Sequence, residues 1–215
     1  MIEDMHTLEV KNINKIYRGK RILQDINADF TGGNIYGITG KNGAGKTVLF
    51  KVMTGLIAPT SGCVLYDGVD LKKSDADIGL LIDDVSFYPE FSGMKNLMLL
   101  AGIRKKIGQH EVARAMERVG LNPSDKTIFW KYSLGMKQRL TLAQAIMEHP
   151  DFLFLDEPTN SIDETGVELF YKIVSEEAQR GAVVLISSHI KSDIKTLADK
   201  VYLMKDMTLT EVGEV

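Results

Sequence analysis

The sequence predicts an α/β fold in which a helical lobe is inserted into a lobe rich in β-strands. Apolar patterns typical of strands occupy about residues 8–82. Helical periodicity replaces them from about residue 84 to residue 150, and strand patterns return afterwards. We therefore expect the 215 residues to form a single domain, with one lobe at about 1–83 and 151–215 and the helical lobe at about 84–150.

The first part of the strand-rich lobe is expected to begin with antiparallel strands. LEVKNINKIY alternates apolar and polar residues, and ILQDINADF repeats that pattern after a turn at Arg18–Lys20. NIYGITG reads as a short strand that ends in glycine, and a helix is expected from about Gly45 to Met53. CVLYDG and DIGLLID are two further strand patterns.

Three stretches carry the helical periodicity of the inserted lobe: GMKNLMLLAGI, HEVARAMERVG and GMKQRLTLAQAIMEH. In the third stretch Leu140, Ala143 and Met147 fall on one helical face. The continuous apolar runs FLFLD and AVVLISS then read as buried strands with a helix between them, and KSDIKTLAD as a last helix. The order of elements predicts a sheet with parallel strands.

Composition narrows the function classes. Hydrophobic residues make up 44% and charged residues 26%, which is typical of a globular protein with a real core. The net charge of -3 argues against a nucleic-acid partner, and neither a secretory signal nor a membrane-spanning segment is expected because no apolar run is long enough. The single cysteine, Cys63, fits the reducing cytoplasm.

The stretch GKNGAGKT, between an expected strand and an expected helix, has the pattern of a phosphate-binding loop. Glycines let backbone N–H groups close around phosphate oxygens, and the helix N-terminus adds its dipole. Lys46 is expected to bridge the β- and γ-phosphates and Thr47 to offer its hydroxyl to Mg²⁺. The residues expected to hold the nucleotide here are Gly40, Lys41, Asn42, Gly43, Ala44, Gly45, Lys46, Thr47 and Val48.

Two carboxylates follow the buried strand of DFLFLDEPTNSID. Asp156 ends the strand and is expected to hold Mg²⁺, directly or through water, beside the phosphate loop. Glu157 is placed to orient and deprotonate an attacking water. His189 follows AVVLISS, and since ligands bind at the carboxyl ends of parallel strands we expect it to sense the γ-phosphate. A pair of solvated acids and a structural histidine are the alternative interpretations.

The stretch YSLGMKQRL indicates a second phosphate-binding helix end. A serine and a glycine begin an amphipathic helix whose first turns carry Lys137 and Arg139. Cations at a helix N-terminus oppose the macrodipole by about 0.3–1 kcal/mol each unless an anion lies there. One chain would then contain two phosphate-receiving helix ends.

These residues together resemble the ATP-binding subunits of ABC transporters. The match covers the phosphate loop Gly40–Thr47, a signature at Ser133–Gln138, the carboxylate strand Phe152–Glu157, a D-loop at Asn160–Asp163 and a switch histidine at His189. Three stretches are most similar to bacterial ATPases of the bacitracin- and lantibiotic-resistance exporter type: SLGMKQR, FYPEFSG and SSHIKSDI. The resemblance implies a P-loop NTPase with a RecA-like core lobe, N-terminal antiparallel strands and an inserted helical lobe.

The resemblance also implies how the two phosphate-binding ends are used. In this family two ATPase subunits pair head to tail, each ATP lying between one phosphate loop and the other subunit's signature. Ser133 and the Gly135 amide would then grip the partner's ATP, Asp163 would cross the interface, and Tyr17 would stack on adenine. For Tyr17, cross-strand packing stays an alternative.

The family resemblance further implies ATP and Mg²⁺ as ligands, and as partners a membrane-spanning permease and a second ATPase subunit, either a copy of this chain or a paralogue. The chain would lie on the cytoplasmic face of the cell membrane and drive transport, with export favoured by the subgroup alone. The segment SFYPEFSGMKNL is expected to contribute part of the groove that docks the permease, although some of its aromatics are expected to pack in the helical lobe.

The sequence departs from the family at two sites. Leu134 and Met136 replace a glycine and the glutamine of the usual signature, while Gly135 keeps the close backbone approach. Asp83 stands where a glutamine usually contacts Mg²⁺, and the neighbouring Asp84 leaves the choice between them open. A soluble ABC-type ATPase, a small-molecule P-loop kinase and an ATP-dependent clamp with little turnover are the alternative functions.

Overall fold

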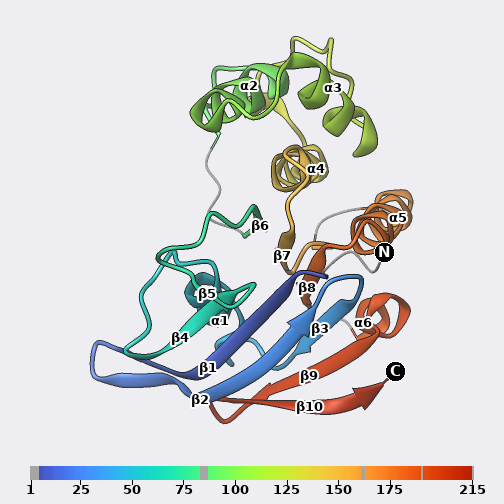
Figure 1. Cartoon of the computed structure of the whole chain (residues 1–215). Coiled ribbons are helices and arrows are strands. Elements are labelled where there is room, and N and C mark those ends of the chain that lie inside the picture. The colour runs from blue at the N-terminus through green and yellow to red at the C-terminus, as the bar shows by residue number, and fades with distance from the viewer. Residues whose placement is uncertain (1–4, 83–86, 161–162, 190, 215) are drawn as a thin grey trace.

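The computed structural model describes residues 5–82, 87–160, 163–189 and 191–214. Two β-sheets form one end of the molecule and helices α2 and α3 the other, with α4 between them (Figure 1). The strands are β1 (Thr7–Tyr17), β2 (Lys20–Thr31), β3 (Ile35–Thr39), β4 (Ser61–Tyr66), β5 (Val69–Asp70), β6 (Ile78–Leu81), β7 (Phe152–Asp156), β8 (Val183–Ser187), β9 (Lys200–Lys205) and β10 (Thr208–Glu214). The helices are α1 (Lys46–Met53), α2 (Gly93–Arg104), α3 (Gln109–Arg118), α4 (Leu134–Ile146), α5 (Glu164–Gln179) and α6 (Lys191–Leu197), with a 3-10 turn at Phe129–Lys131.

The smaller sheet is antiparallel, in the order β2-β1-β4-β5. It confirms the expected N-terminal hairpin, because Tyr17 pairs with Lys20 across a two-residue turn. Arg18 and Gly19 make that turn with φ angles of 48° and 77°, the left-handed geometry of a tight hairpin that follows strand twist. The turn leaves Tyr17 at the end of the sheet.

The larger sheet has the order β10-β9-β3-β8-β7-β6. All its neighbours run parallel except β9 and β10, which form an antiparallel hairpin at one edge. The burial of β7 and β8 along their whole length matches the continuous apolar runs of the sequence. The α/β fold with parallel strands is therefore confirmed.

Helix α1 lies between the two sheets and fills the space with apolar side chains. Leu49, Phe50 and Met53 are fully buried in one cluster with residues of both sheets. Phe50 meets Phe154 of β7 edge to face, with ring centroids 5.6 Å apart. The phosphate loop, which leads into α1, thus rests on a closely packed base.

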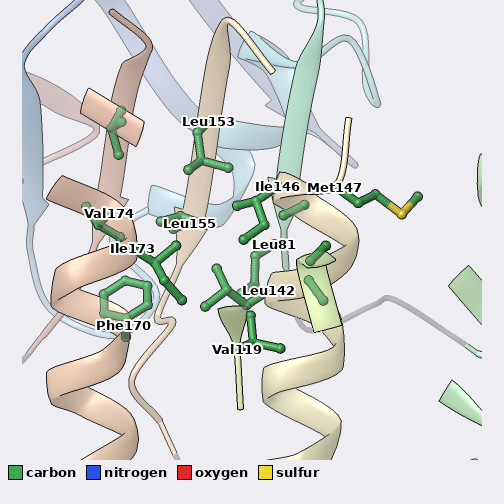
Figure 2. Packing of buried hydrophobic residues seen from close by; sticks show 14 of the residues in the cluster. Leu81, Val119, Leu142, Ile146, Met147, Leu153, Leu155, Phe170, Ile173 and Val174 are labelled. Carbon is green, nitrogen blue, oxygen red and sulfur yellow. The ribbon is translucent and has the colours of Figure 1, made fainter. Parts of the chain in front are cut away.

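A second core joins the helical segment to the larger sheet. Figure 2 shows Phe170, Ile173 and Val174 of α5 on one side of β7, and Leu142 and Ile146 of α4 on the other. The same cluster includes buried residues of α2, α3, β6 and β8. Helix α4 therefore shares its core with the sheet, and the boundaries near 84 and 150 stay a proposal.

Ion pairs add to the apolar contact between α3 and α5. Glu177 of α5 is 2% exposed, and its carboxylate accepts hydrogen bonds from Arg118 of α3 (2.7 Å) and from Arg180. Burial acts to lower the pKa of Arg118, but hydrogen bonds to Glu177 and Glu176 outweigh it and raise that pKa above its usual value. A buried charge of this kind is tolerated because it is fully paired.

Gly79 of β6 lies where the sheet packs closely against α4, so a substitution there tests this packing. A Cβ at this position would lie 2.1 Å from the carbonyl oxygen of Ala145 and 2.7 Å from the Pro150 ring. We expect Gly79→Ala to lower the free energy of unfolding by about 1–3 kcal/mol, because the backbone of α4 must shift. Urea unfolding of this variant measures the loss. Gly102→Ala on α2 is the control, because a Cβ there meets nothing within 4 Å. It should raise the free energy of unfolding by about 0.5–1 kcal/mol. Similar free energies of unfolding for the two variants would contradict the packing described.

Candidate functional site

Three neighbouring strands bring the sequence-predicted phosphate and carboxylate residues together. In the larger sheet β8 lies between β3 and β7, and all three run parallel. The phosphate loop follows β3, Asp156 is the last residue of β7 and Glu157 comes directly after it, and His189 follows β8. Their carboxyl ends meet at one edge, which is where ligands bind in open α/β sheets.

The backbone of the phosphate loop requires its glycines. A Cβ on Gly40 would lie 2.5 Å from the carbonyl oxygen of Met204, so no side chain fits there. Gly45 is the N-cap of α1 with a φ angle of 108°, and as a glycine it offers no side chain to cap that helix end. The first N–H groups of α1 can therefore bond to an external acceptor such as a phosphate.

Lys46 is the most deeply buried cation of the site. Its side chain is 6% exposed, and its ammonium donates to the carbonyl oxygen of Gly40 (2.9 Å) and lies 3.2 Å from Glu157 Oε1. A buried ammonium needs such partners because water is excluded from it. Both partners lie where the loop and the carboxylate strand meet, so the ammonium sits at the centre of the site.

Asp156 is held by two hydroxyl groups. Thr47 Oγ1 donates to Asp156 Oδ2 over 2.5 Å, and Ser187 Oγ donates to Oδ1. Asp156 is 5% exposed and Ser187 fully buried. The carboxylate and the threonine hydroxyl offer adjacent hard oxygen ligands, which fits Mg²⁺. Ser187 was not predicted from the sequence, since only its place at the end of a buried strand could have suggested it.

Glu157 lies between Lys46 and His189. Its Oε2 is 2.6 Å from His189 Nδ1 and accepts the backbone N–H of His189 at 3.2 Å. Its own N–H donates to the carbonyl oxygen of Ser187, and its φ angle is 48°. A glutamate in this left-handed region is strained, and strained backbone persists where the surroundings fix it, often at functional sites.

Ser133 and Gly135 begin α4, apart from the elements that hold the phosphate loop. Helix α4 packs on α3 and β6, whereas α1 packs on β7 and β2. Ser133 is the N-cap of α4, and its Oγ accepts the N–H of Met136 at 3.2 Å. The hydroxyl hydrogen of Ser133 stays free to donate to an anion.

The two cations of α4 have partners within the chain. The Lys137 ammonium lies 5.3 Å from the centroid of the Phe129 ring. Arg139 Nη2 donates to Asp163 Oδ1 at 2.9 Å. The anion that Arg139 needs near this helix end is therefore supplied by the chain's own Asp163, a contact that the sequence did not reveal.

Asp163 and Tyr17 are both exposed. Asp163 caps α5 by accepting the N–H of Gly166, and hydrogen bonds from the Thr165 hydroxyl and then from Arg139 hold its pKa below the usual value. The Tyr17 ring is 57% exposed, with the Arg18 guanidinium carbon 5.4 Å from its centroid. Tyr17 is therefore no core residue. Asp83, expected near the metal, lies outside the described residues.

The chain matches a known family over more than half of its length. The sequence model of the family described as ABC transporter matches residues 23–160. The chain belongs to the ABC transporter family. It is accordingly an ATP-binding protein of this family and an ATPase.

Relatives of this ABC ATPase cover most of it. It is 42% identical over 195 residues to the uncharacterized ABC transporter ATP-binding protein YybJ of Bacillus subtilis (strain 168), covering 89% of each chain. It is 37% identical to the bacitracin transport ATP-binding protein BcrA of Enterococcus faecalis, over 96% of this chain and 68% of BcrA. It is 34% identical to the lantibiotic transport ATP-binding protein SrtF of Streptococcus pyogenes, over 89% and 84%.

A solved structure supports the fold of this ABC ATPase. It is described as "Dimeric Structure of MJ0796, a Bacterial ABC Transporter Cassette", and it matches with a TM-score of 0.85 at 20% identity. The match covers 97% of this chain and 100% of that one. The predicted fold class, an α/β P-loop ATPase of the ABC type, is confirmed.

Two further features of the ABC ATPase concern membrane spans and metal-binding clusters. No helix in the part of the chain that the structure describes has the length and apolar character needed to cross a membrane. Among the same residues, no three histidine, cysteine, aspartate or glutamate side chains come together as a metal site.

Proposed function

We propose that this ABC ATPase binds the inner face of the cell membrane and powers export through a separate membrane-spanning subunit. The observation that carries the proposal is the convergence of Lys46, Thr47, Asp156, Glu157 and His189 at one edge of the sheet. The names of two relatives, which refer to bacitracin and lantibiotic transport, support the class of system. The membrane subunit would select the substrate.

The loop residues Gly40 to Val48 would cradle the ATP phosphates with their backbone N–H groups. The Lys46 ammonium already lies at the N-terminus of α1, where the phosphates would bind. Lys46 would therefore give up its contact with Glu157 and bind the β- and γ-phosphates. A phosphate oxygen offers a stronger, charge-assisted hydrogen bond than the Gly40 carbonyl does. Binding would thus release Glu157 from Lys46.

The hydroxyl of Thr47 and the carboxylate of Asp156 are the proposed protein ligands of Mg²⁺, with Asp83 as a third candidate. When bound, the ion would neutralise phosphate charge. Ser187 fixes the orientation of Asp156 by donating to its other oxygen. A carboxylate whose orientation is fixed by a second hydrogen bond binds a metal more tightly than a freely rotating one does.

Glu157 is the proposed general base for the attacking water. Once freed from Lys46, its Oε1 has no other partner among the contacts described, while Oε2 stays bonded to His189. One oxygen can therefore accept a proton while the other holds the carboxylate in place. His189 would also contact the γ-phosphate, since its ring is 45% exposed at the edge of the site.

Each ATP would be completed by a second ATPase subunit, a copy of this chain or a paralogue. Ser133 and the amide of Gly135 would contact the γ-phosphate held by that subunit, because both begin a helix whose N-terminus is exposed. The Ser133 hydroxyl can accept from Met136 and donate to phosphate at once. The exposed Asp163 would face the same interface.

The docking of the membrane subunit is proposed for the segment before α2. Phe87 packs on Phe129 in the helical lobe, with ring centroids 5.1 Å apart, and so belongs to the core. Tyr88 is 61% exposed and is the better interface anchor. Asn96 of α2, 2% exposed, bonds to the backbone N–H and carbonyl groups of Tyr88 and so fixes this loop.

Tyr17 is the proposed adenine contact. Base–aromatic stacking is worth about 1–3 kcal/mol, so Tyr17→Ala should weaken ATP binding about 5- to 150-fold. Tyr17→Phe keeps the ring and should bind ATP nearly as the unchanged protein does. Isothermal titration with ATP measures both. Equal affinities for the alanine and phenylalanine variants would contradict stacking.

Purification of the tagged chain from the membranes of its own host tests the transport proposal. We expect a polytopic membrane protein to accompany the chain in detergent and to stimulate its ATPase activity when the two are reconstituted. Recovery with ribosomes, or a polytopic protein without any effect on turnover, would contradict it.

A further inference from the structure

Two neighbouring residues of α4 hold the chain that follows Glu157. Gln138 Nε2 donates to the carbonyl oxygen of Pro158 at 3.1 Å. Arg139 Nη2 donates to Asp163 Oδ1 at 2.9 Å. Pro158 comes directly after Glu157, and Asp163 is the N-cap of α5. The helix that begins with Ser133 therefore touches the chain behind the proposed base at two points.

The Arg139 side chain is partly buried, although the Asp163 carboxylate that it binds is exposed. The Arg139 side chain is 23% exposed, and Gly120 lies so close that a Cβ there would be 3.0 Å from Arg139 Nη1. The Asp163 carboxylate that it binds also accepts the N–H of Gly166 and the hydroxyl of Thr165. A guanidinium fixed in this way loses less entropy on pairing than a mobile surface arginine does.

Glu157 needs such support because its backbone is strained. Its φ angle of 48° is unfavourable for a residue with a side chain. The N–H of Glu157 is fixed by the carbonyl oxygen of Ser187 at 3.0 Å, and Gln138 fixes the carbonyl oxygen of the next residue. Without the second anchor the segment could relax and carry the carboxylate away from the site.

The same helix carries Ser133 at its start. Arg139 comes six positions after Ser133, which is about 9 Å along a helix axis. Leu142 and Ile146 follow Gln138 by one and two turns on the same side of α4, and both are packed in the core (Figure 2). A shift of Ser133 along or across this rigid element is therefore transmitted to Gln138 and Arg139.

We propose that Gln138 and Arg139 are positioning residues that hold the segment containing Glu157. Through them, the position of the Glu157 carboxylate depends on the position of α4. The helix thereby links the ATP contacted through Ser133 to the base that acts on the chain's own ATP. This inference rests on the proposed function, and neither residue touches the reacting atoms.

Steady-state kinetics of Arg139→Gln, Arg139→Lys and Gln138→Met test the inference. We expect Arg139→Gln and Gln138→Met to lower kcat about 10- to 100-fold, because a displaced base loses rate steeply, with KM for ATP changed by less than about two-fold. Arg139→Lys should recover part of kcat, since lysine can still pair with Asp163. The matched control is Arg114→Gln on α3, an exposed arginine outside the site, which should keep full activity.

A second measurement separates this inference from the proposed function. The double variant Arg139→Gln with Glu157→Gln should still form the ATP-bound dimer on size exclusion. If it does and Arg139→Gln keeps kcat within about two-fold of the unchanged protein, the positioning role is wrong while the paired arrangement stands. If the double variant stays a monomer although Glu157→Gln alone dimerises, Arg139 acts in the interface and the inference is overturned. If Glu157→Gln alone stays a monomer, the proposed function itself fails.

Discussion

Replacing Lys46 with alanine should lower the affinity for ATP at least about 100-fold. The Lys46 ammonium is buried at the N-terminus of α1. There it would make charge-assisted hydrogen bonds with phosphate oxygens, each worth about 1.5–3 kcal/mol. Losing two such bonds corresponds to about 3–6 kcal/mol, or a factor of about 100 or more in the dissociation constant. Isothermal titration with Mg-ATP measures the change.

Controls for this variant are available within the chain. Lys126→Ala removes an exposed lysine of the helical segment and should leave ATP affinity unchanged. In Lys46→Ala, Glu157 keeps its partner His189, so the fold should survive, as thermal unfolding would verify. An unchanged affinity for ATP in folded Lys46→Ala would contradict the role assigned to this residue.

Replacing Glu157 with glutamine should lower turnover by about 10²–10⁴ while ATP stays bound. The amide has nearly the shape of the carboxylate, but it cannot accept the proton of the attacking water. The neutral side chain also no longer competes with phosphate for Lys46, which lies 3.2 Å from Glu157 Oε1. We therefore expect the affinity for ADP, which is not hydrolysed, to be equal or higher in Glu157→Gln.

The ATP that is bound but not hydrolysed should hold two subunits together. Size exclusion of Glu157→Gln at saturating Mg-ATP should give a dimer, and at the same concentration without nucleotide a monomer. Glu168→Gln, the same change at an exposed site on α5, should retain turnover and serves as the control. A monomer for Glu157→Gln at saturating Mg-ATP would argue against the shared site.

The position of the phosphate and carboxylate residues was predictable because it depends on strand order alone. Parallel strands place their carboxyl ends at one edge, so residues that follow β3, β7 and β8 must meet. Asp156 ends β7, and Lys46, Glu157 and His189 follow their strands; the four residues lie together as expected. The continuous apolar runs made those strands easy to find.

The β9–β10 hairpin and the contacts of Gln138 and Arg139 were not predicted, because no local sequence pattern indicates them. The β9–β10 hairpin turns at Asp206 and Met207, both with positive φ, so it lacks the glycine that usually marks such turns. Gln138 and Arg139 bond to Pro158 and Asp163, about 20 residues further along the chain. Their polar character indicated only a charged helix start, and tertiary structure supplied the partners.

The most direct test of a site shared between two subunits mixes two inactive proteins. Lys46→Ala cannot hold its own ATP but keeps an intact Ser133, whereas Ser133→Arg keeps its phosphate loop and blocks the ATP of its neighbour. In a mixed dimer one complete site forms, so we predict that ATPase activity appears on mixing and peaks near equal amounts. Activity in the mixture no greater than the sum of the two proteins alone would contradict the shared site, because Ser133 would then serve only the ATP of its own chain.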